Sequence, residues 1–451
     1  MADPKKLTKI KSSLFQRSFS MAKLTFNTGA GIASHKISTL LSSSETRAEK
    51  WTDFLRSQAK EFSTELGELK GSLMKAGQML SMYGEHFLPP EANEMLKSLR
   101  SQSPPVDWNV MRLILETELG ADKLSLLEIE PEAIGSASLG QVHKARILAT
   151  DQWIVLKIQY PGVEKAIDSD LKALRSFLSM AKLLPKALAS DHIFSEVRSM
   201  LIQEVDYRQE ADFTEQYAQK LGPDSRFVIP KVFREFSTGK VLATSFERGI
   251  ESDDTLVKNL SQERRNRLAL NYLDLYFTEL FEWGLVQTDP HAGNYKVRLD
   301  AGGSDQLVLL DFGAVRAYPS EFLKSYRQMI QASINQDLIL FEQAAIALKF
   351  LGPEDDPEIK KVFFDFCQQM IEPFREDKDY DYKKTDLPQR LTKKGFEMIQ
   401  RFSLKLRSPP REVLFLDRKT GGAFIFCSMM GAKINGRPLL LKYLNKPLAS
   451  L

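Results

Sequence analysis

The chain has 451 residues, of which 43% are hydrophobic and 27% are charged, and its formal net charge is +3. This length favours two or three packed units over one small core, and the near-neutral balance argues against a general attraction to nucleic acid. Two cysteines in apolar surroundings, Cys367 and Cys427, argue against a disulfide framework or a zinc site and indicate a reducing compartment. No apolar run is long enough to span a bilayer, so any membrane contact is expected to be peripheral.

The first 45 residues are basic and rich in Ser and Thr, and residues 1–50 carry nine Lys or Arg against three acids. A mobile segment is favoured over an amphipathic membrane-surface segment or an organellar transit peptide. No secretory hydrophobic region follows, so export is not expected. From residue 46 to 100, apolar residues recur at three- and four-residue intervals, which predicts helices. They contain Lys75-Ala76-Gly77-Gln78, whose glycine hints at close packing.

A run of very small residues, GSASLGQVH over 135–143, lies between two β-prone pieces and follows a helix predicted over 108–119. A strand-turn-strand that covers phosphates needs such residues, because larger side chains hold the backbone away from the ligand. By itself the run favours a plain tight hairpin. The next predicted strand, 153–159, carries Lys157 among apolar neighbours, at the distance expected of a phosphate-holding lysine.

Helices are predicted over 163–180 and 191–220. The second contains Glu204, Asp206 and Glu210, which on a helix would usually form a solvated face. A kinase-like site needs one helical glutamate to hold its lysine, because an unpaired buried ammonium is costly, and Glu204 and Glu210 are the candidates. Two strands, 227–230 and 240–246, are then predicted around a Ser-Thr-Gly-Lys turn, followed by a hinge at 247–249 and a helix over 262–283.

The stretch from 287 to 313 carries the clearest chemistry. Asp289 is followed five residues later by Asn294, and the apolar run 307–310 leads into Asp311-Phe312-Gly313. A kinase-type site needs an Asp near the attacking group, and an Asn and a second Asp that hold Mg²⁺ against the phosphates. Hard cations take such oxygen ligands from carboxylates and amides. Beyond residue 316, helices are predicted over 319–331, 338–351, 357–370 and 387–406, without a recognisable chemical motif.

Together these motifs resemble the UbiB/ADCK (AarF) family of atypical protein-kinase-like proteins, from about residue 66 to residue 316. Lys75-Ala76-Gly77-Gln78 matches the K-x-G-Q signature of that family, and Glu204-Val205-Asp206 matches its E-x-D motif. Ser136-Ala137-Ser138 with Gly140-Gln141 resembles the alanine-rich loop that replaces a glycine-rich loop. Two positions depart from the family pattern: Gly135 stands where Ala is more common, and Ser245 stands where the hinge often has Glu.

The resemblance implies an α+β, bilobed protein-kinase-like fold with an N-terminal helical extension and a mostly helical C-terminal lobe. We expect a basic segment over 1–45 and a helical extension with the K-x-G-Q motif over 46–125. A kinase-like N-lobe with inserted helices is expected over 126–250, and the C-lobe with its C-terminal helices over 251–451.

The resemblance also implies ATP and Mg²⁺ as cofactors and assigns a role to each motif residue. Lys75 would pair with Glu204 and Lys157 with Glu210, and the K-x-G-Q segment would close the cleft to protein substrates. The expected residues are catalytic Asp289 and Lys157; nucleotide-binding Gly135, Ser136, Ala137, Ser138, Gly140, Gln141, Lys157, Glu210, Ser245 and Glu247; metal-binding Asn294 and Asp311; and gating Lys75, Gly77, Gln78, Glu204 and Asp206.

The implied function is an atypical kinase or ATPase that supports ubiquinone or isoprenoid-lipid metabolism. One alternative is a catalytically silent pseudokinase that binds nucleotide and regulates a partner, and a second, less favoured one is a true protein kinase. The expected partners are ATP and ADP, with an isoprenoid lipid, quinone-biosynthesis proteins and a peripheral membrane contact as further candidates, and no nucleic acid. The expected location is a bacterial cytoplasm with membrane association, or alternatively the mitochondrial matrix.

Overall fold

The computed structural model describes residues 71–87, 106–137, 139–180, 191–402 and 411–446, and it divides the chain into two compact units. The first unit comprises residues 1–216 and 230–246, and the second comprises residues 217–229 and 247–451. One division therefore lies inside helix α8 (Tyr207–Leu221). The predicted basic N-terminal segment, the helices predicted over 46–70 and 88–100, Ser138 and the side chain of Gln78 lie outside the described residues.

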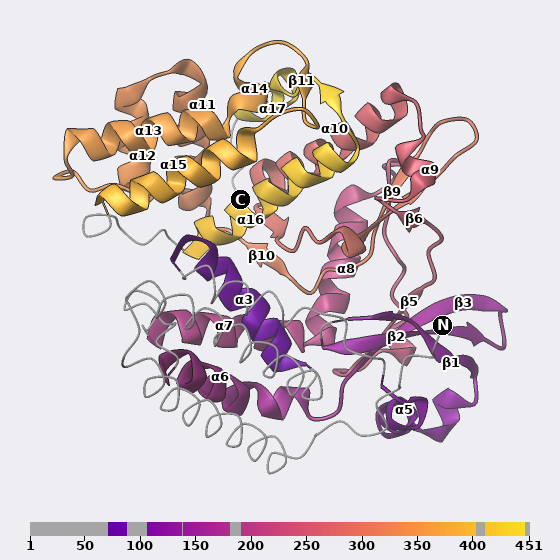
Figure 1. The fold of residues 1–451 in the computed structure, drawn as a ribbon. Coiled ribbons are helices and arrows are strands. Elements are labelled where there is room, and N and C mark those ends of the chain that lie inside the picture. The colour runs from indigo at the N-terminus through magenta and orange to yellow at the C-terminus, as the bar shows by residue number, and fades with distance from the viewer. Residues whose placement is uncertain (1–70, 88–105, 138, 181–190, 403–410, 447–451) are drawn as a thin grey trace, which may run out of the picture. The chain divides into compact units, whose positions relative to one another are not determined.

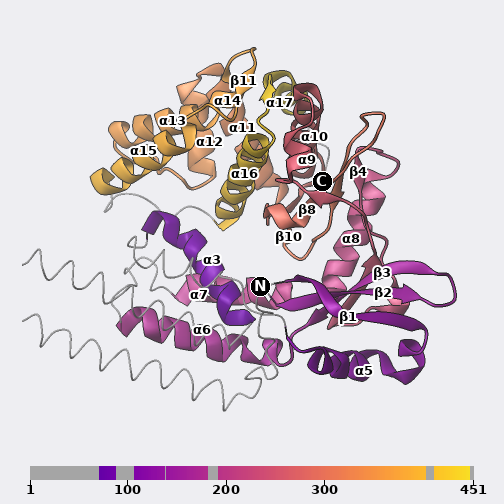
Figure 2. The same ribbon diagram turned by 45° about the vertical axis from the view of Figure 1, so that its right-hand side comes forward.

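The first unit contains a four-stranded antiparallel sheet in the order β1-β2-β3-β5 (Figures 1 and 2). The strands are β1 (Leu127–Ser136), β2 (Gly140–Ile147), β3 (Gln152–Gln159) and β5 (Val241–Ser245). Helix α5 (Trp108–Leu124) contacts β1 and β3 and buries Met111, Leu115 and Leu119, which share one face because they are spaced four apart. Asp107 caps its start by accepting a hydrogen bond from the backbone N–H of Asn109.

Three helices of the first unit, α3 (Ser72–Phe87), α6 (Val163–Met180) and α7 (Asp191–Glu204), pack against one another, and Figures 1 and 2 both show them side by side. Ser72 at the start of α3 donates a hydrogen bond of 2.5 Å to Asp170 of α6, and both residues are buried. Gly77 of α3 is also buried, which agrees with the close packing that a glycine in a helix interior indicates. The K-x-G-Q segment thus lies on a helix that is anchored within its own unit.

The second unit contains a four-stranded sheet in the order β4-β9-β8-β6 and a two-stranded sheet of β10 and β7. Helix α10 (Gln262–Thr278) ends in a π-helix (Glu279–Trp283), and Gly284 then takes the left-handed conformation that lets the chain turn into β7. The strands are β4 (Phe227–Val228), β6 (Ile250–Glu251), β7 (Leu285–Gln287), β8 (Tyr295–Arg298), β9 (Gln306–Leu309) and β10 (Val315–Ala317).

Helices make up most of the rest of the second unit. They are α9 (Thr255–Lys258), α11 (Ser320–Asn335), α12 (Leu338–Ala347), α13 (Pro357–Met370), α14 (Glu372–Arg375), α15 (Leu387–Phe402), α16 (Arg411–Met429) and α17 (Arg437–Leu444). The strands β11 (Tyr380–Asp381) and β12 (Lys433–Ile434) pair with each other. Short 3₁₀ turns lie at Arg234–Phe236 in the first unit and at Ala292–Asn294 in the second. Within the described ranges, no helix is long and apolar enough to cross a membrane.

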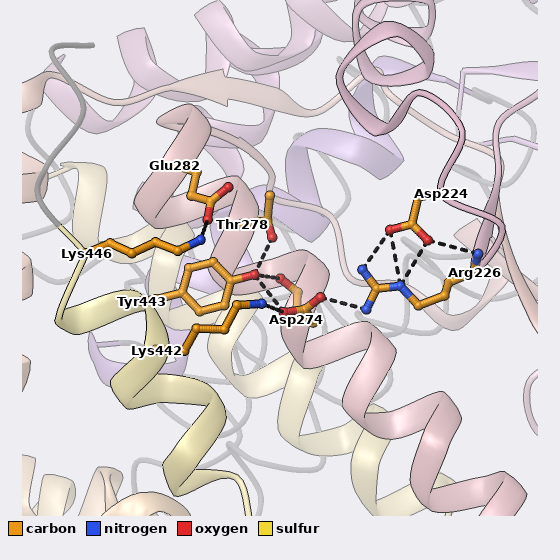
Figure 3. Close-up of polar contacts among 8 residues, drawn as sticks. All are labelled: Asp224, Arg226, Asp274, Thr278, Glu282, Lys442, Tyr443 and Lys446. Carbon is orange, nitrogen blue, oxygen red and sulfur yellow. Dashed lines mark hydrogen bonds and ion pairs between the residues drawn. The ribbon is translucent and has the colours of Figure 1, made fainter.

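A polar network joins α17 to α10 and to the loop before β4 (Figure 3). Asp274 of α10 accepts hydrogen bonds from the Tyr443 hydroxyl at 2.6 Å and from Arg226 at 2.6 Å, and Lys442 lies 3.3 Å from it. Thr278 shares a 2.7 Å hydrogen bond with the same hydroxyl. Since Asp274 is buried, these donors compensate the cost of holding a carboxylate away from water.

The predicted fold class is confirmed: an N-terminal β-sheet is followed by a mostly helical C-terminal part. Helices predicted over 163–180 and 357–370 have those bounds in the structure, and the helix predicted over 191–220 is broken at residues 205–206. The two strands predicted around the Ser-Thr-Gly-Lys turn exist but do not pair with each other. Instead, β4 runs parallel to β9 in one sheet and β5 runs antiparallel to β3 in the other.

Candidate active site

Lys157 and Glu210 form a close ion pair in the first unit. Lys157 stands in the middle of β3, opposite Val142 of β2 and Leu242 of β5. Its ammonium nitrogen lies 2.7 Å from Oε1 and 2.9 Å from Oε2 of Glu210, which occupies the first turn of α8. The Glu210 side chain is only 3% exposed, so its carboxylate needs this partner. The Lys157 side chain is 17% exposed, which leaves room for contact with an anionic ligand.

The run of small residues forms the hairpin of β1 and β2. Gly135 and Ser136 are exposed at its end, and backbone hydrogen bonds of 2.9 and 3.4 Å between Ala137 and Gly140 close the turn. A Cβ atom at Gly140 would lie 2.5 Å from the carbonyl oxygen of Ile158. Glycine is therefore required where β2 packs against β3, and the exposed end of the hairpin carries side chains no larger than Ser among the described residues.

Three of the predicted nucleotide-binding side chains contact other parts of the protein. The buried Gln141 accepts a 2.9 Å hydrogen bond from the Val106 N–H and donates one of 3.2 Å to the carbonyl of the same residue. The Ser245 hydroxyl accepts a 2.9 Å hydrogen bond from the backbone of Lys231, and Glu247 forms a 2.6 Å ion pair with an arginine of β8. A nucleotide contact at these positions remains a prediction, and it would draw on backbone groups.

Lys75 and Glu204 form a second ion pair in the first unit, with 2.6 Å between Nζ and Oε1. Lys75 lies on α3 and its side chain is 4% exposed, and Glu204 is the last residue of α7. Asp206 accepts hydrogen bonds of 3.1 and 3.2 Å from two backbone N–H groups in the first turn of α8. It thereby caps the helix that carries Glu210, which is a structural role beside the predicted gating role.

In the second unit, Asp289 is the second residue of the loop that follows β7. The backbone N–H and the hydroxyl of Thr288 both donate to the Ala314 carbonyl, at 3.1 and 2.7 Å, and fix the start of the loop. The side-chain amide nitrogen (Nδ2) of Asn294 donates to the backbone carbonyl of Asp289 at 2.9 Å and closes the loop. Because the nitrogen of this amide is the donor, its oxygen is the Asn294 atom that can bind a cation.

Asn294 and Asp311 come to the same end of a strand pair. Asn294 precedes β8, Asp311 follows β9, and the strands pair antiparallel with Tyr295 opposite Leu309. Oδ1 of Asp311 accepts a 3.0 Å hydrogen bond from the Gly313 N–H. A carboxylate and an amide oxygen suit Mg²⁺, which is commonly held by one or two carboxylates together with substrate phosphates. Across the described residues, no three His, Cys, Asp or Glu side chains gather as a metal site. Phosphate oxygens and water are the ligands that would accompany one carboxylate and one amide oxygen on Mg²⁺.

Arg418 of α16 is a site residue that the sequence analysis missed. Its Nη2 lies 2.5 Å from Oδ1 of Asp289, and the two side chains are 21% and 12% exposed. One helical turn further on, a Cβ atom at Gly422 would lie 2.1 Å from Cβ of Pro290, so only glycine lets α16 approach the loop this closely. A signal was present in the sequence, since a glycine inside a helix such as Gly422 destabilises it and indicates close packing.

Comparison with known proteins supports the motif analysis. A model of the ABC1 atypical kinase-like domain matches residues 98–344. Probable serine/threonine-protein kinase abkA of Dictyostelium discoideum is 29% identical over 95% of this chain and 78% of its own length. Mitochondrial atypical kinase COQ8 of Saccharomyces cerevisiae is 29% identical over 96% of this chain and 85% of its own length. Mitochondrial COQ8B of Rattus norvegicus is 31% identical, over 97% and 82% respectively.

A solved structure is also similar in fold. It is that of Rv3197 from Mycobacterium tuberculosis in complex with erythromycin, with a TM-score of 0.61 and 24% sequence identity. The likeness covers 89% of this chain and 100% of that chain.

Proposed function

We propose that this chain, which belongs to the ABC1 atypical kinase-like family, is an atypical kinase or ATPase that uses Mg-ATP. Membership of a kinase-like family implies that it binds nucleotide. The observation that carries the proposal is the Lys157–Glu210 pair, in which a partly exposed lysine side chain is held at 2.7 and 2.9 Å by a buried carboxylate. A cation fixed in this way is prepared to bind phosphate, since its position is set before the ligand arrives.

Each proposed role follows from the chemistry of the side chain. Lys157 binds the α- and β-phosphates, and Glu210 orients it. Asn294 and Asp311 would hold Mg²⁺, which when bound neutralises charge on the phosphates. Asp289 orients the attacking hydroxyl or water and accepts its proton, so the protein acts mainly through positioning and electrostatics.

The acceptor that we propose is water or a small or lipid-like molecule rather than a protein. The support is the K-x-G-Q segment, which the family resemblance assigns to closing the cleft, together with the 2.6 Å ion pair between Lys75 and Glu204. Support of ubiquinone or isoprenoid-lipid metabolism is part of the proposal, as is action at a membrane surface reached peripherally, in a bacterial cytoplasm or a mitochondrial matrix. Quinone and precursor content in cells that lack the protein, rescued by wild type or by Asp311→Asn, tests this part.

The second candidate function is that of a pseudokinase that binds nucleotide and signals its bound state to a partner. The observation that favours it is the ion pair between Arg418 and Asp289, because it engages the proposed catalytic carboxylate with a protein cation. A true protein kinase ranks below both, since helix α11 begins at Ser320, soon after Gly313, and leaves little chain for an activation loop.

Turnover of Mg-ATP by the purified chain separates these functions. We expect phosphate release by the wild type and a loss of at least about 100-fold in Asp311→Asn, because removing one electrostatic contact to a transition state typically costs this much. Equal rates for the two proteins, with and without lipid vesicles, would favour the pseudokinase. Radiolabel transfer to many unrelated proteins would favour the protein kinase.

A further inference from the structure

Helix α16 carries a buried lysine, Lys419, directly after Arg418, which contacts Asp289. Lys419, next to Arg418 in sequence, is 1% exposed, and its Nζ lies 3.1 Å from Oε2 of Glu279 in the π-helix. The rings of Tyr272, Tyr276 and Tyr295 surround the ammonium at 5.3, 6.0 and 5.8 Å from their centroids. Burial alone would lower the pKa of Lys419, but the neighbouring Glu279 carboxylate raises it above its ordinary value.

A chain of hydrogen bonds leads from Lys419 to both loops of the site. The ammonium donates to the Tyr295 hydroxyl at 3.4 Å, and that hydroxyl donates to Oε1 of Gln287 at 3.0 Å. With its oxygen engaged, the Gln287 amide donates through Nε2 to the backbone carbonyls of Asp289 at 3.0 Å and Asp311 at 3.4 Å. One buried glutamine thus touches both the loop of the proposed base and the loop of the proposed metal ligand.

We infer that Lys419 and Tyr295 are positioning residues. They act through Gln287 to fix the positions of the Asp289 and Asp311 loops relative to each other. The inference rests on the proposed function only for the roles of those two aspartates. The chain has a direction: Lys419 can only donate, so Tyr295 must donate onward, and this selects the amide orientation in which Nε2 faces the two loop carbonyls. An error of about 1 Å between two catalytic groups is enough to cost turnover heavily.

Stability alone does not explain a charge at this place. Burying an ion pair costs desolvation, and apolar residues of similar size are often as stabilising or more so. The three tyrosine rings already provide an apolar setting that a methionine would fill. A cation is favoured over an apolar side chain here if its hydrogens donate to specific acceptors, and Lys419 contacts Glu279 at 3.1 Å and the Tyr295 hydroxyl at 3.4 Å.

Tyr295→Phe tests the inference, and Tyr272→Phe is its matched control. Both tyrosines are buried and lie beside Lys419, but of the two only the Tyr295 hydroxyl donates to Gln287. In Mg-ATP turnover we expect Tyr295→Phe to lower kcat about 10-fold with KM within twofold, while Tyr272→Phe leaves both within twofold. Equal effects of the two changes, or a loss seen only in KM, would overturn the inference.

Amide hydrogen exchange without nucleotide gives a readout that needs no turnover. Exchange of peptides covering 288–294 and 311–314 should be at least about fivefold faster in Tyr295→Phe than in the wild type or Tyr272→Phe, with equal melting temperatures. The paired change Lys419→Met with Glu279→Gln, which leaves no uncompensated charge, should speed exchange in the same peptides. Unchanged exchange in both variants would overturn the inference. If the wild type turns over no faster than Asp311→Asn, the proposed function fails, and exchange alone still decides this inference.

Discussion

At the scale of single residues, the contact between Arg418 and Asp289 bears most directly on activity. The guanidinium holds one carboxylate oxygen at 2.5 Å and so limits the directions in which the carboxylate can point. We expect Arg418→Gln to lower kcat about 10-fold, with little change in KM for ATP, because Asp289 would keep its charge but lose its orientation. Initial rates of Mg-ATP hydrolysis over a range of ATP concentrations measure both constants.

Two companion variants show whether the effect belongs to this contact. Arg418→Lys keeps the charge and should recover part of the loss, though not all of it, because lysine lacks the planar donor fork. Arg401→Gln removes an arginine from an exposed ion pair with Glu358 elsewhere in the second unit and should leave both constants unchanged. A rise in kcat for Arg418→Gln would instead mark the contact as inhibitory and would contradict the positioning role.

At the scale of elements, the network around Asp274 in Figure 3 decides how firmly α17 and α10 are joined. Burial acts to raise the pKa of Asp274, but hydrogen bonds from Tyr443 and Arg226 outweigh it and hold the pKa below its ordinary value. A depressed pKa means that the charged form stabilises the fold. We expect Asp274→Asn to lower the free energy of unfolding by about 2 kcal/mol at pH 7.

The pH dependence follows from the sign of that shift. The contribution of Asp274 is fully present above its unfolded pKa of about 3.9 and is lost as the pH falls through the lower folded value. Denaturant titrations should therefore show a constant difference between wild type and Asp274→Asn from pH 8 to 5, which narrows below about pH 4. The exposed Asp253 is the control, since Asp253→Asn should change stability by less than about 0.5 kcal/mol at each pH. A difference that widens on acidification would contradict this reading.

How far elements could be predicted from sequence depends on whether their cause is local. Helix α6 was predicted with its bounds because the signals are local: the helical pattern lies within the segment, and Pro161-Gly162 comes immediately before it. The break at 205–206 was missed because an Asp within an acidic helical run can be read either as a solvated surface residue or as the cap of a new helix. The pairing of β4 with β9 joins residues about 80 positions apart, and no periodicity reports such a distance.

Whether a residue of the candidate site could be predicted also depends on whether its signal is local in the sequence. The motifs of Lys157, Asp289, Asn294 and Asp311 could be read from the sequence because each has a fixed local spacing. For Arg418 the sequence offers only the close-packing signal of Gly422. Its contact with Asp289 could not be predicted, because the two residues lie 129 positions apart and no spacing rule links them. The buried role of Gln141 was also hidden, since a glutamine in a strand looks the same whether it binds a ligand or a backbone segment.

At the scale of the whole molecule, the proposal predicts that bound nucleotide stabilises the fold. A ligand that binds only the folded state at 100 times its Kd adds about 2.7 kcal/mol to the free energy of unfolding. For a chain of this size we expect Mg-ATP to raise the melting temperature on the order of 5 °C. Thermal scans with Mg-ATP, ATP with a chelator, and Mg²⁺ alone measure the shift, and the first should exceed the other two.

Two single changes, one in each unit, make the test specific. Lys157→Met should abolish most of the Mg-ATP shift, and since it leaves the buried Glu210 without its cation, the variant should also melt lower before any ligand is added. Asp311→Asn should instead melt like the wild type without ligand and lose the part of the shift that depends on Mg²⁺. The contrast matters because it separates loss of binding from loss of fold. If both variants kept the full shift, nucleotide would bind through neither set of residues, and the assignment of Lys157 and Asp311 would be wrong even with the family unchanged.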